Sequence, residues 1–410
     1  MRKNESLSPH RASPGVLHLV AACAAGPFLD GYSTASAAFL IALIDALSVW
    51  ETALFTSLYL TGTIVGALVT GAVADRTGRR RPALAAMALT AIVAALAAVS
   101  QALAALLVMR LATGFLLCGD YPVGQALVVE LAPEHKRPGA LSSLMLAWYF
   151  GALSAVALAV PVVEGGLHWS LFLWAEAAAA AAALILRLGI PESPLWLKSR
   201  RSAAARDASG GESFSLRALT SAISRSRSAF FFCCAFWLCQ TIPGTIMMTY
   251  SPTILHSLTG TQDAVVQMAL IYGCFLIGIL PSGSRWFRNH LKTVLLLTFV
   301  MMAAGILGVL VFGRTSTALT NISFVVFALS YGLQSALDFV YPNLLFKDGA
   351  RAWLVGAVTA VSRIGAAGAA FLYPPLAEIL DLTTLFCCGL LVLAAGFFIG
   401  WRMAPADAAA

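Results

Sequence analysis

Twelve apolar stretches, each as long as a membrane-spanning helix, determine what this chain can fold into. A run of about 18 or more residues with few charges is typical of a membrane helix. Charged residues make up only 11% of the chain, whereas soluble domains carry about 25%. The sequence therefore predicts an all-α membrane protein with twelve transmembrane helices. The predicted spans are 15–43, 52–74, 82–100, 102–131, 139–163, 168–188, 229–255, 262–283, 291–313, 317–342, 353–374 and 382–402.

The basic residues predict which side of the membrane each loop faces. With the amino terminus inside the cell, all Lys and Arg except Arg110, Arg314 and Arg363 fall in cytoplasmic segments, which is 23 of 26. An excess of Lys and Arg in cytoplasmic loops sets the orientation of membrane proteins. We therefore expect a multi-pass protein of the cell (inner) membrane with both termini cytoplasmic. Because the net charge of +7 comes from these loops, it does not indicate nucleic-acid binding.

One change of composition divides the chain into two halves. Residues 198–228 are rich in Ser, Arg and Ala and poor in aliphatic residues, as expected of a linker. The second half reads as a weak repeat of the first, so we predict two six-helix pseudo-repeat bundles. The predicted domains are a cytoplasmic tail at 1–14, bundles at 15–197 and 229–403, the cytoplasmic linker, and a second tail at 404–410.

A charged hairpin connects the second and third predicted spans. Gly71, Asp75, Arg76, Gly78 and Arg79 define the spacing G-x-x-x-D-R-x-G-R-R between two apolar runs. This pattern resembles the cytoplasmic loop between the second and third helices of major facilitator superfamily transporters. The resemblance implies two six-helix bundles and a gating role for the loop. A stretch after the sixth span, P-E-S-P-L-W-L, resembles a signature of sugar- and metabolite-transporting branches of the same superfamily.

Four of the charged residues inside predicted spans are candidates for a transport pathway, since a charge there costs about 2.5–3.5 kcal/mol on insertion scales. They are Asp30, Arg110, Asp120 and Arg363. Such residues usually face a cavity or a partner and mark transport pathways. Arg110 and Asp120 lie about 280° apart around one helix, so they need separate partners. Pro27 and its glycine neighbours are expected to weaken the first span locally and to free backbone carbonyls.

The fourth span resembles that of proton symporters in the superfamily. Arg110 is followed by Gly114 and then by Gly119-Asp120-Tyr121-Pro122. Phosphate symporters, and the metabolite and aromatic-acid symporters, are the most similar branches. In the phosphate branch the matching Asp is a proton and substrate residue, and the resemblance implies this role for Asp120. The acidic residue that the branch carries after the Trp of its seventh helix is absent after Trp237, which disfavours inorganic phosphate.

The expected function is proton-coupled uptake of a small organic anion or other polar metabolite by alternating access. Arg363 is expected to hold the negative charge of the substrate, because its planar fork suits carboxylate or phosphate, while Asp30 and Asp120 are alternately protonated. Trp237 fits a lipid-facing or core position equally well. The other predicted substrate-binding residues are Tyr32, Tyr121, Gln125, Gln240 and Trp237. The predicted gating residues are Asp75, Arg76, Arg79, Arg110, Glu130, Arg137 and Asp338.

Two alternatives stay open. Proton-antiport export of drugs or metabolites shares the Arg of the fourth span, although Asp30 and Arg363 favour a polar ligand. A non-transporting membrane sensor is the alternative from another class, and it usually brings a large soluble domain. No Ser-His pair or metal set occurs at catalytic spacing, so we expect no enzyme activity, no cofactor and no metal. The expected partners are protons, substrate and lipid, for a chain acting as a monomer. The role of Glu176 stays open.

Overall fold

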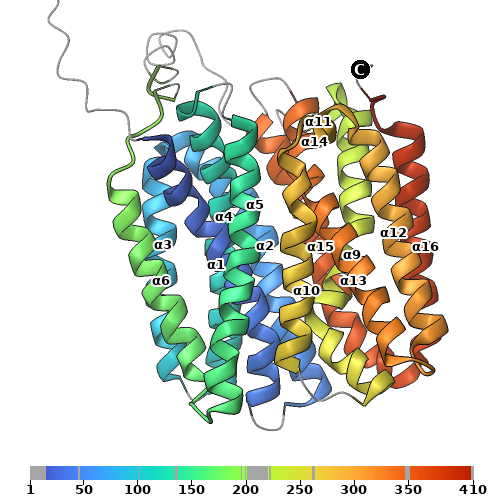
Figure 1. Ribbon diagram of the computed structural model, residues 1–410. Helices are drawn as coiled ribbons and strands as arrows, with labels where there is room; N and C mark the ends of the chain where they lie inside the picture. The colour runs from blue at the N-terminus through green and yellow to red at the C-terminus, as the bar shows by residue number, and fades with distance from the viewer. Residues whose placement is uncertain are drawn as a thin grey trace, which may run out of the picture.

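The helices form two groups that stand side by side (Figure 1). The computed structural model describes residues 15–407 apart from 45–46, 101, 134–136, 195, 199, 201–219, 221–222, 261–263 and 347–350. The predicted tail at 1–14 and most of the predicted linker at 198–228 lie outside the described residues.

The first group contains six long helices, and the second contains six spans of which one is broken. The first comprises α1 (Val16–Leu43), α2 (Val49–Thr77), α3 (Arg80–Val99), α4 (Leu103–Leu131), α5 (Arg137–Ala159, continued by the π-helical turn Val160–Glu164) and α6 (Ser170–Leu188). The second comprises α9 (Arg227–Thr259), α10 (Ala264–Ile279), α12 (Leu291–Phe312), α13 (Thr317–Ser335), α14 (Leu337–Leu345), α15 (Arg351–Ile379) and α16 (Leu382–Met403). A short α11 (Arg285–Asn289) precedes α12.

The predicted spans and the observed helices agree closely, and the twelve-helix architecture is confirmed. Among the described residues, 11 helical segments are long and apolar enough to cross a membrane, with α13 and α14 counted as one. The remaining span is α1, whose 28 residues suffice for a crossing but include Asp30 and several hydroxyl residues. Contrary to the expected local weakening, α1 is continuous through Pro27. The helix break lies instead at Ala336, between α13 and α14.

Glycine contacts repeat between the two groups and explain why the pairs pack so closely. A Cβ on Gly114 of α4 would lie 2.0 Å from the Tyr59 carbonyl oxygen of α2. In the second group, a Cβ on Gly332 of α13 would lie 2.2 Å from the Phe275 carbonyl oxygen of α10. The equivalent pairs α2–α4 and α10–α13 therefore meet backbone to backbone. Across the two groups, α2 packs on α15 and α5 packs on α10.

We expect the Gly114→Ala variant to lose folded protein, because its methyl group would overlap the α2 backbone at 2.0 Å. Overpacking of this kind costs about 1–3 kcal/mol or more when backbone must move. The matched control is Gly273→Ala on α10, where an added Cβ meets nothing within 4 Å and alanine favours the helix by about 1 kcal/mol. Thermal unfolding followed in detergent distinguishes them, and equal melting temperatures for both variants would contradict the packing argument.

A tight turn joins α2 to α3 and fixes the charged hairpin. Gly78 ends α2 with φ of 98°, a backbone conformation that favours glycine. A Cβ there would lie 2.3 Å from Glu192 Oε2. The Glu192 carboxylate accepts the backbone N–H groups of Arg79 at 2.7 Å and of Arg80 at 3.2 Å. Glu192 therefore caps the start of α3, where the helix dipole favours a negative charge. We call this face of the molecule the Gly78 end.

Candidate functional site

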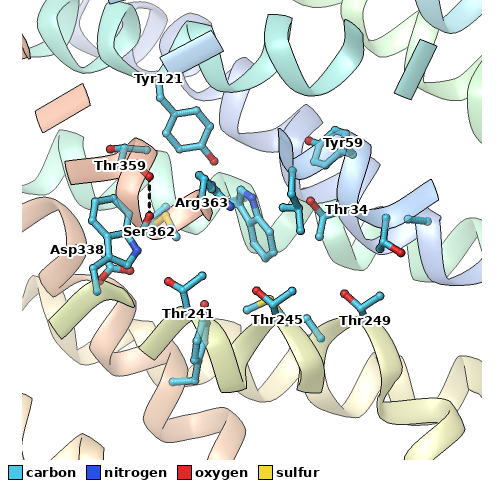
Figure 2. A pocket seen from close by; sticks show the side chains of 18 of the residues that line it. Thr34, Tyr59, Tyr121, Thr241, Thr245, Thr249, Asp338, Thr359, Ser362 and Arg363 are labelled. Carbon is cyan, nitrogen blue, oxygen red and sulfur yellow. Dashed lines mark hydrogen bonds between the residues drawn. The ribbon is translucent and has the colours of Figure 1, made fainter. Parts of the chain in front are cut away.

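A cavity of about 70 Å³ lies between the two helix groups. Aromatic rings dominate its wall, together with hydroxyl groups and a few charged side chains, as shown in Figure 2. The aromatic members are Tyr59, Tyr121, Trp148, Tyr149, Trp237, Tyr331 and Phe339. Three threonines of α9, Thr241, Thr245 and Thr249, follow one another at four-residue spacing, so they share one helix face. A flat polar molecule suits such a wall.

Asp30 lies directly behind this wall and is held by groups that form it. Its carboxylate accepts hydrogen bonds from the Tyr59 hydroxyl, from the Tyr121 hydroxyl at 2.8 Å and from the Trp148 indole N–H at 2.8 Å. The guanidinium of Arg363 lies 3.6 Å away. Asp30 is fully buried and is absent from the cavity wall itself. A change in the charge of Asp30 therefore affects the cavity wall through the side chains of Tyr59, Tyr121, Trp148 and Arg363.

Arg363 links Asp30 to the cavity. Its guanidinium lines the wall, and 19% of the side chain is exposed there. Its Nε is buried and has no hydrogen-bond partner. Of the predicted substrate-binding residues, Arg363, Tyr121 and Trp237 line the cavity. Arg363 can thus present an N–H group to an anionic ligand while it remains beside Asp30.

Arg110 forms a second charged cluster on the α6 side of Asp30. Its guanidinium donates to the Ser33 hydroxyl at 2.8 Å and stacks over the Tyr59 ring, 4.4 Å from the centroid. The buried carboxyl of Glu176 lies beside Arg110 in a small adjoining cavity. Tyr59 therefore contacts both charged clusters, donating to Asp30 and stacking under Arg110. The sequence left the role of Glu176 open; in the structure it lies near this cluster, and its Oε1 has no hydrogen-bond partner.

Asp120 lies away from the central cavity, in a bidentate ion pair with Arg187 of α6. The two bonds join Arg187 Nη1 to Asp120 Oδ1 at 2.5 Å and Arg187 Nη2 to Asp120 Oδ2 at 2.6 Å. The same guanidinium donates to the carbonyl oxygens of Ala22 at 2.9 Å and Ala83 at 3.0 Å. Arg187 therefore connects α1, α3, α4 and α6. As predicted, Arg110 and Asp120 have separate partners.

Three other predicted substrate residues are buried but do not form the cavity wall. Tyr32 donates its hydroxyl to the Phe172 carbonyl oxygen at 2.9 Å and so holds α6. The side-chain oxygen of Gln125 and both polar atoms of Gln240 are buried without a partner. Their positions in helices with other polar residues suggested a binding role. The direction of each side chain, which the sequence does not show, decides whether it reaches the cavity.

Several of the predicted gating residues gather at the Gly78 end. Arg79 lies 3.6 Å from Glu130, which ties the α2–α3 turn to the end of α4. Arg137 donates to the Ala132 carbonyl oxygen at 3.2 Å. Arg76 is exposed, while the side chain of Asp75 lies outside what the structure describes. Asp338, another predicted gating residue, lies in the first turn of α14 and lines the central cavity.

The two groups of helices are separated at the Gly78 end and in contact at the other. A larger cavity of about 580 Å³ opens at the Gly78 end, between residues such as Arg137 and Leu141 of the first group and Arg288 and Asn343 of the second. We call it the vestibule. Met145 and Phe339 line both the vestibule and the central cavity.

At the opposite end, aromatic side chains join the groups. The hydroxyls of Thr56 and Tyr250 lie 3.3 Å apart, and the rings of Trp50 and Phe371 lie 6.0 Å apart between centroids. Together with the vestibule, these contacts describe one of the two conformations that alternating access requires.

Two helix bundles around a central cavity are an arrangement found in secondary transporters, whose substrate sites lie between structural repeats. Comparison with known proteins specifies the class: the model of the Major Facilitator Superfamily matches residues 22–370. The chain belongs to this superfamily and is a multi-pass membrane transporter, not an enzyme.

Three similar proteins illustrate the relationship. The inner membrane metabolite transport protein YgcS of Escherichia coli (strain K12) is 27% identical over 363 residues, covering 84% of this chain and 81% of YgcS. The 3-(3-hydroxy-phenyl)propionate transporter of the same strain is 27% identical over 310 residues, covering 74% and 72%. The solved structure of the proton:xylose symporter XylE bound to 6-bromo-6-deoxy-D-glucose has a TM-score of 0.77 at 17% identity, covering 95% of this chain and 96% of that chain. At that identity the likeness concerns the fold.

Proposed function

We propose that the protein carries a small organic anion together with a proton, and that Asp30 and Arg363 couple the two. The observation that carries the proposal is the position of Arg363, 3.6 Å from the buried Asp30 carboxylate on one side and on the cavity wall on the other. While Asp30 is ionised, it partly neutralises Arg363. Protonation of Asp30 leaves the guanidinium charge uncompensated, which strengthens anion binding in the cavity.

Linkage makes this coupling reciprocal. If proton binding at Asp30 raises the affinity for the anion, then anion binding at Arg363 raises the affinity for the proton by the same factor. Binding of both is therefore favoured over binding of either alone, as symport requires. Moving one negative charge into an inside-negative cell costs about 2.3 kcal/mol per 100 mV, and the accompanying proton cancels that cost. The relative named for 3-(3-hydroxy-phenyl)propionate supports an aromatic acid as the anion.

The orientation proposed from the basic residues completes the mechanism. With the Gly78 end facing the cytoplasm, the vestibule is the exit for substrate released into the cell. Arg137, Arg288 and the short α11 then belong to the cytoplasmic face, as the positive-inside rule requires. Cysteine labelling of residue 166, in the exposed turn at the other end, tests this assignment: an impermeant reagent added to whole cells should react with a Gly166→Cys variant.

The Arg363→Ala variant should lose anion uptake by about tenfold to a hundredfold, whereas Arg363→Lys should retain part of it. A charged hydrogen bond contributes about 1.5–3 kcal/mol, and a lysine keeps the charge without the planar fork. This effect is measured as uptake into proteoliposomes whose interior is made alkaline. The labelled substrates are 3-(3-hydroxyphenyl)propionate, which is an anion, and xylose, which is uncharged. Proton movement is followed by a pH electrode in the outer medium.

Three results would count against the proposal. Uptake without alkalinisation of the medium would show that no proton is carried with the substrate. Equal activity of the Arg363→Ala and Arg363→Lys variants would show that Arg363 makes no specific contact with the anion. Accumulation only when the gradient is reversed favours the antiport alternative. Thr249→Val, on the same cavity wall but without charge, serves as the matched control for damage to the cavity.

A further inference from the structure

Buried polar atoms without partners gather on the side of the cavity formed by the second helix group. They include Thr241 Oγ1, Asp338 Oδ1 and Arg363 Nε, all on residues of the cavity wall. Directly behind the wall, Gln240 and Gln334 each have both side-chain polar atoms unpaired. Burial of an unpaired polar group is costly, so each such group needs an explanation. A ligand that pairs with them as it binds supplies one.

Asp338 is the member of this set that the organic-anion proposal does not use. It is 4% exposed, and its Oδ1 has no hydrogen-bond partner. Among the ion pairs recorded for the described residues, none includes Asp338. It occupies the first turn of α14, directly after the helix break at Ala336.

Aromatic rings surround the same part of the cavity. Trp237, Tyr331 and Phe339 line the wall with Asp338, and the Trp237 and Phe339 rings meet edge to face with centroids 6.2 Å apart. Aromatic faces attract cations within about 6 Å of the ring centroid. A carboxylate combined with aromatic rings is a suitable environment for an ammonium group and an unsuitable one for a second anion.

We propose that Asp338 is a specificity-determining residue and that the cavity selects small ampholytes, which carry an anionic group for Arg363 and a protonated amine for Asp338. Figure 2 shows both side chains on the wall of the one cavity. The inference rests on the proposed anion contact of Arg363 and adds a second, opposite charge to the substrate. A plain monoanion leaves Asp338 unpaired in a desolvated site, so its affinity is lower.

The charge of the substrate has a measurable consequence for transport. A monoanion carried with one proton moves no net charge. An ampholyte with balanced charges, carried with one proton, moves one positive charge inward. Uptake of the ampholyte is therefore driven by an inside-negative membrane potential even without a pH difference, whereas uptake of the monoanion is not.

A matched ligand series tests the inference on the full chain in lipid nanodiscs. The probes are 3-(aminomethyl)benzoate, 3-methylbenzoate of nearly the same shape, and benzylamine, with binding measured by calorimetry. The ampholyte should bind about tenfold or more tightly than 3-methylbenzoate, because a charged hydrogen bond contributes about 1.5–3 kcal/mol and 1.4 kcal/mol is tenfold. Asp338→Asn should abolish this preference, and Asp338→Glu should keep part of it. Asp381→Asn, which neutralises an exposed carboxylate at the start of α16, should leave the preference unchanged.

The outcomes separate the two proposals. If 3-methylbenzoate binds, depends on Arg363, and is bound as well as the ampholyte, the role of Asp338 is overturned while the anion proposal stands. If the ampholyte preference survives in Asp338→Asn, the role of Asp338 is likewise overturned. If no member of the series binds, or if Arg363→Ala changes nothing, both proposals fail. Size-exclusion profiles identify variants that do not fold. If Asp338→Asn does not fold, the ligand preference of Asp338→Glu is the deciding measurement.

Discussion

The Asp30→Asn variant is expected to exchange substrate across a membrane without accumulating it. With its amide oxygen at the Oδ2 position, asparagine still accepts hydrogen bonds from Tyr121 and Trp148, and its NH2 group can donate to the Tyr59 hydroxyl. The wall around Arg363 therefore keeps its geometry. Asparagine cannot take up or release a proton, and it leaves the Arg363 charge permanently uncompensated. Anion binding is therefore retained, while the dependence of binding on protonation is lost.

Two assays on the same proteoliposomes measure this effect. Counterflow, in which unlabelled substrate inside drives entry of labelled substrate, should remain within about threefold of the unmodified protein. Accumulation driven by an imposed pH difference should fall to the level of empty vesicles. The two assays differ only in whether a proton must cross. Loss of both activities would show that Asp30 is needed for the cavity structure, and retention of both would move the proton site elsewhere.

Removal of one partner of the Asp120–Arg187 pair should prevent stable folding. Arg187→Met leaves the Asp120 carboxylate buried without its two bonds, and breaking a buried ion pair costs about 3–5 kcal/mol. It also removes the bonds to the carbonyl oxygens of α1 and α3. Combining Arg187→Met with Asp120→Leu replaces the pair by apolar side chains and should recover most of the lost stability. Melting temperature in detergent is the measurement, with exposed Arg314→Met as the control.

The double variant also tests the predicted proton role of Asp120. If Asp120 carries the proton, the recovered protein should fold and exchange substrate yet fail to accumulate it. If the pair only joins helices, accumulation returns with folding. Failure of the double variant to recover stability would show that the carbonyl bonds of Arg187, and not the neutralisation of charge, hold the four helices together.

Hydropathy was sufficient to predict the helices because few other structures can span a bilayer. Each span must satisfy its own backbone hydrogen bonds and cover about 30 Å of hydrocarbon, so length and apolarity locate it. The break at Ala336 was not predicted, because no glycine or proline marks it and Pro342 lies within α14. Tertiary packing decides such a break, and a single span of sequence carries no sign of it.

The charged residues were predictable as a set but not as pairs. Asp30 and Arg363 stood out because a charge within an apolar run needs a partner, yet they lie 333 positions apart in the sequence. Arg187 was counted with the cytoplasmic charges, since it ends a span where a long side chain can reach the interface. It turns inward because Gly26 leaves room for Asp120 beside it: a Cβ there would lie 2.0 Å from Asp120 Oδ2.

Among the described residues, only Met145 and Phe339 border both the central cavity and the vestibule. Side-chain rotations take picoseconds to nanoseconds, whereas domain rocking takes microseconds to milliseconds. We therefore expect the rotation of one ring and one thioether to be fast compared with the rocking of the two helix groups. Turnover is then expected to be limited by rocking and not by passage from the cavity into the vestibule.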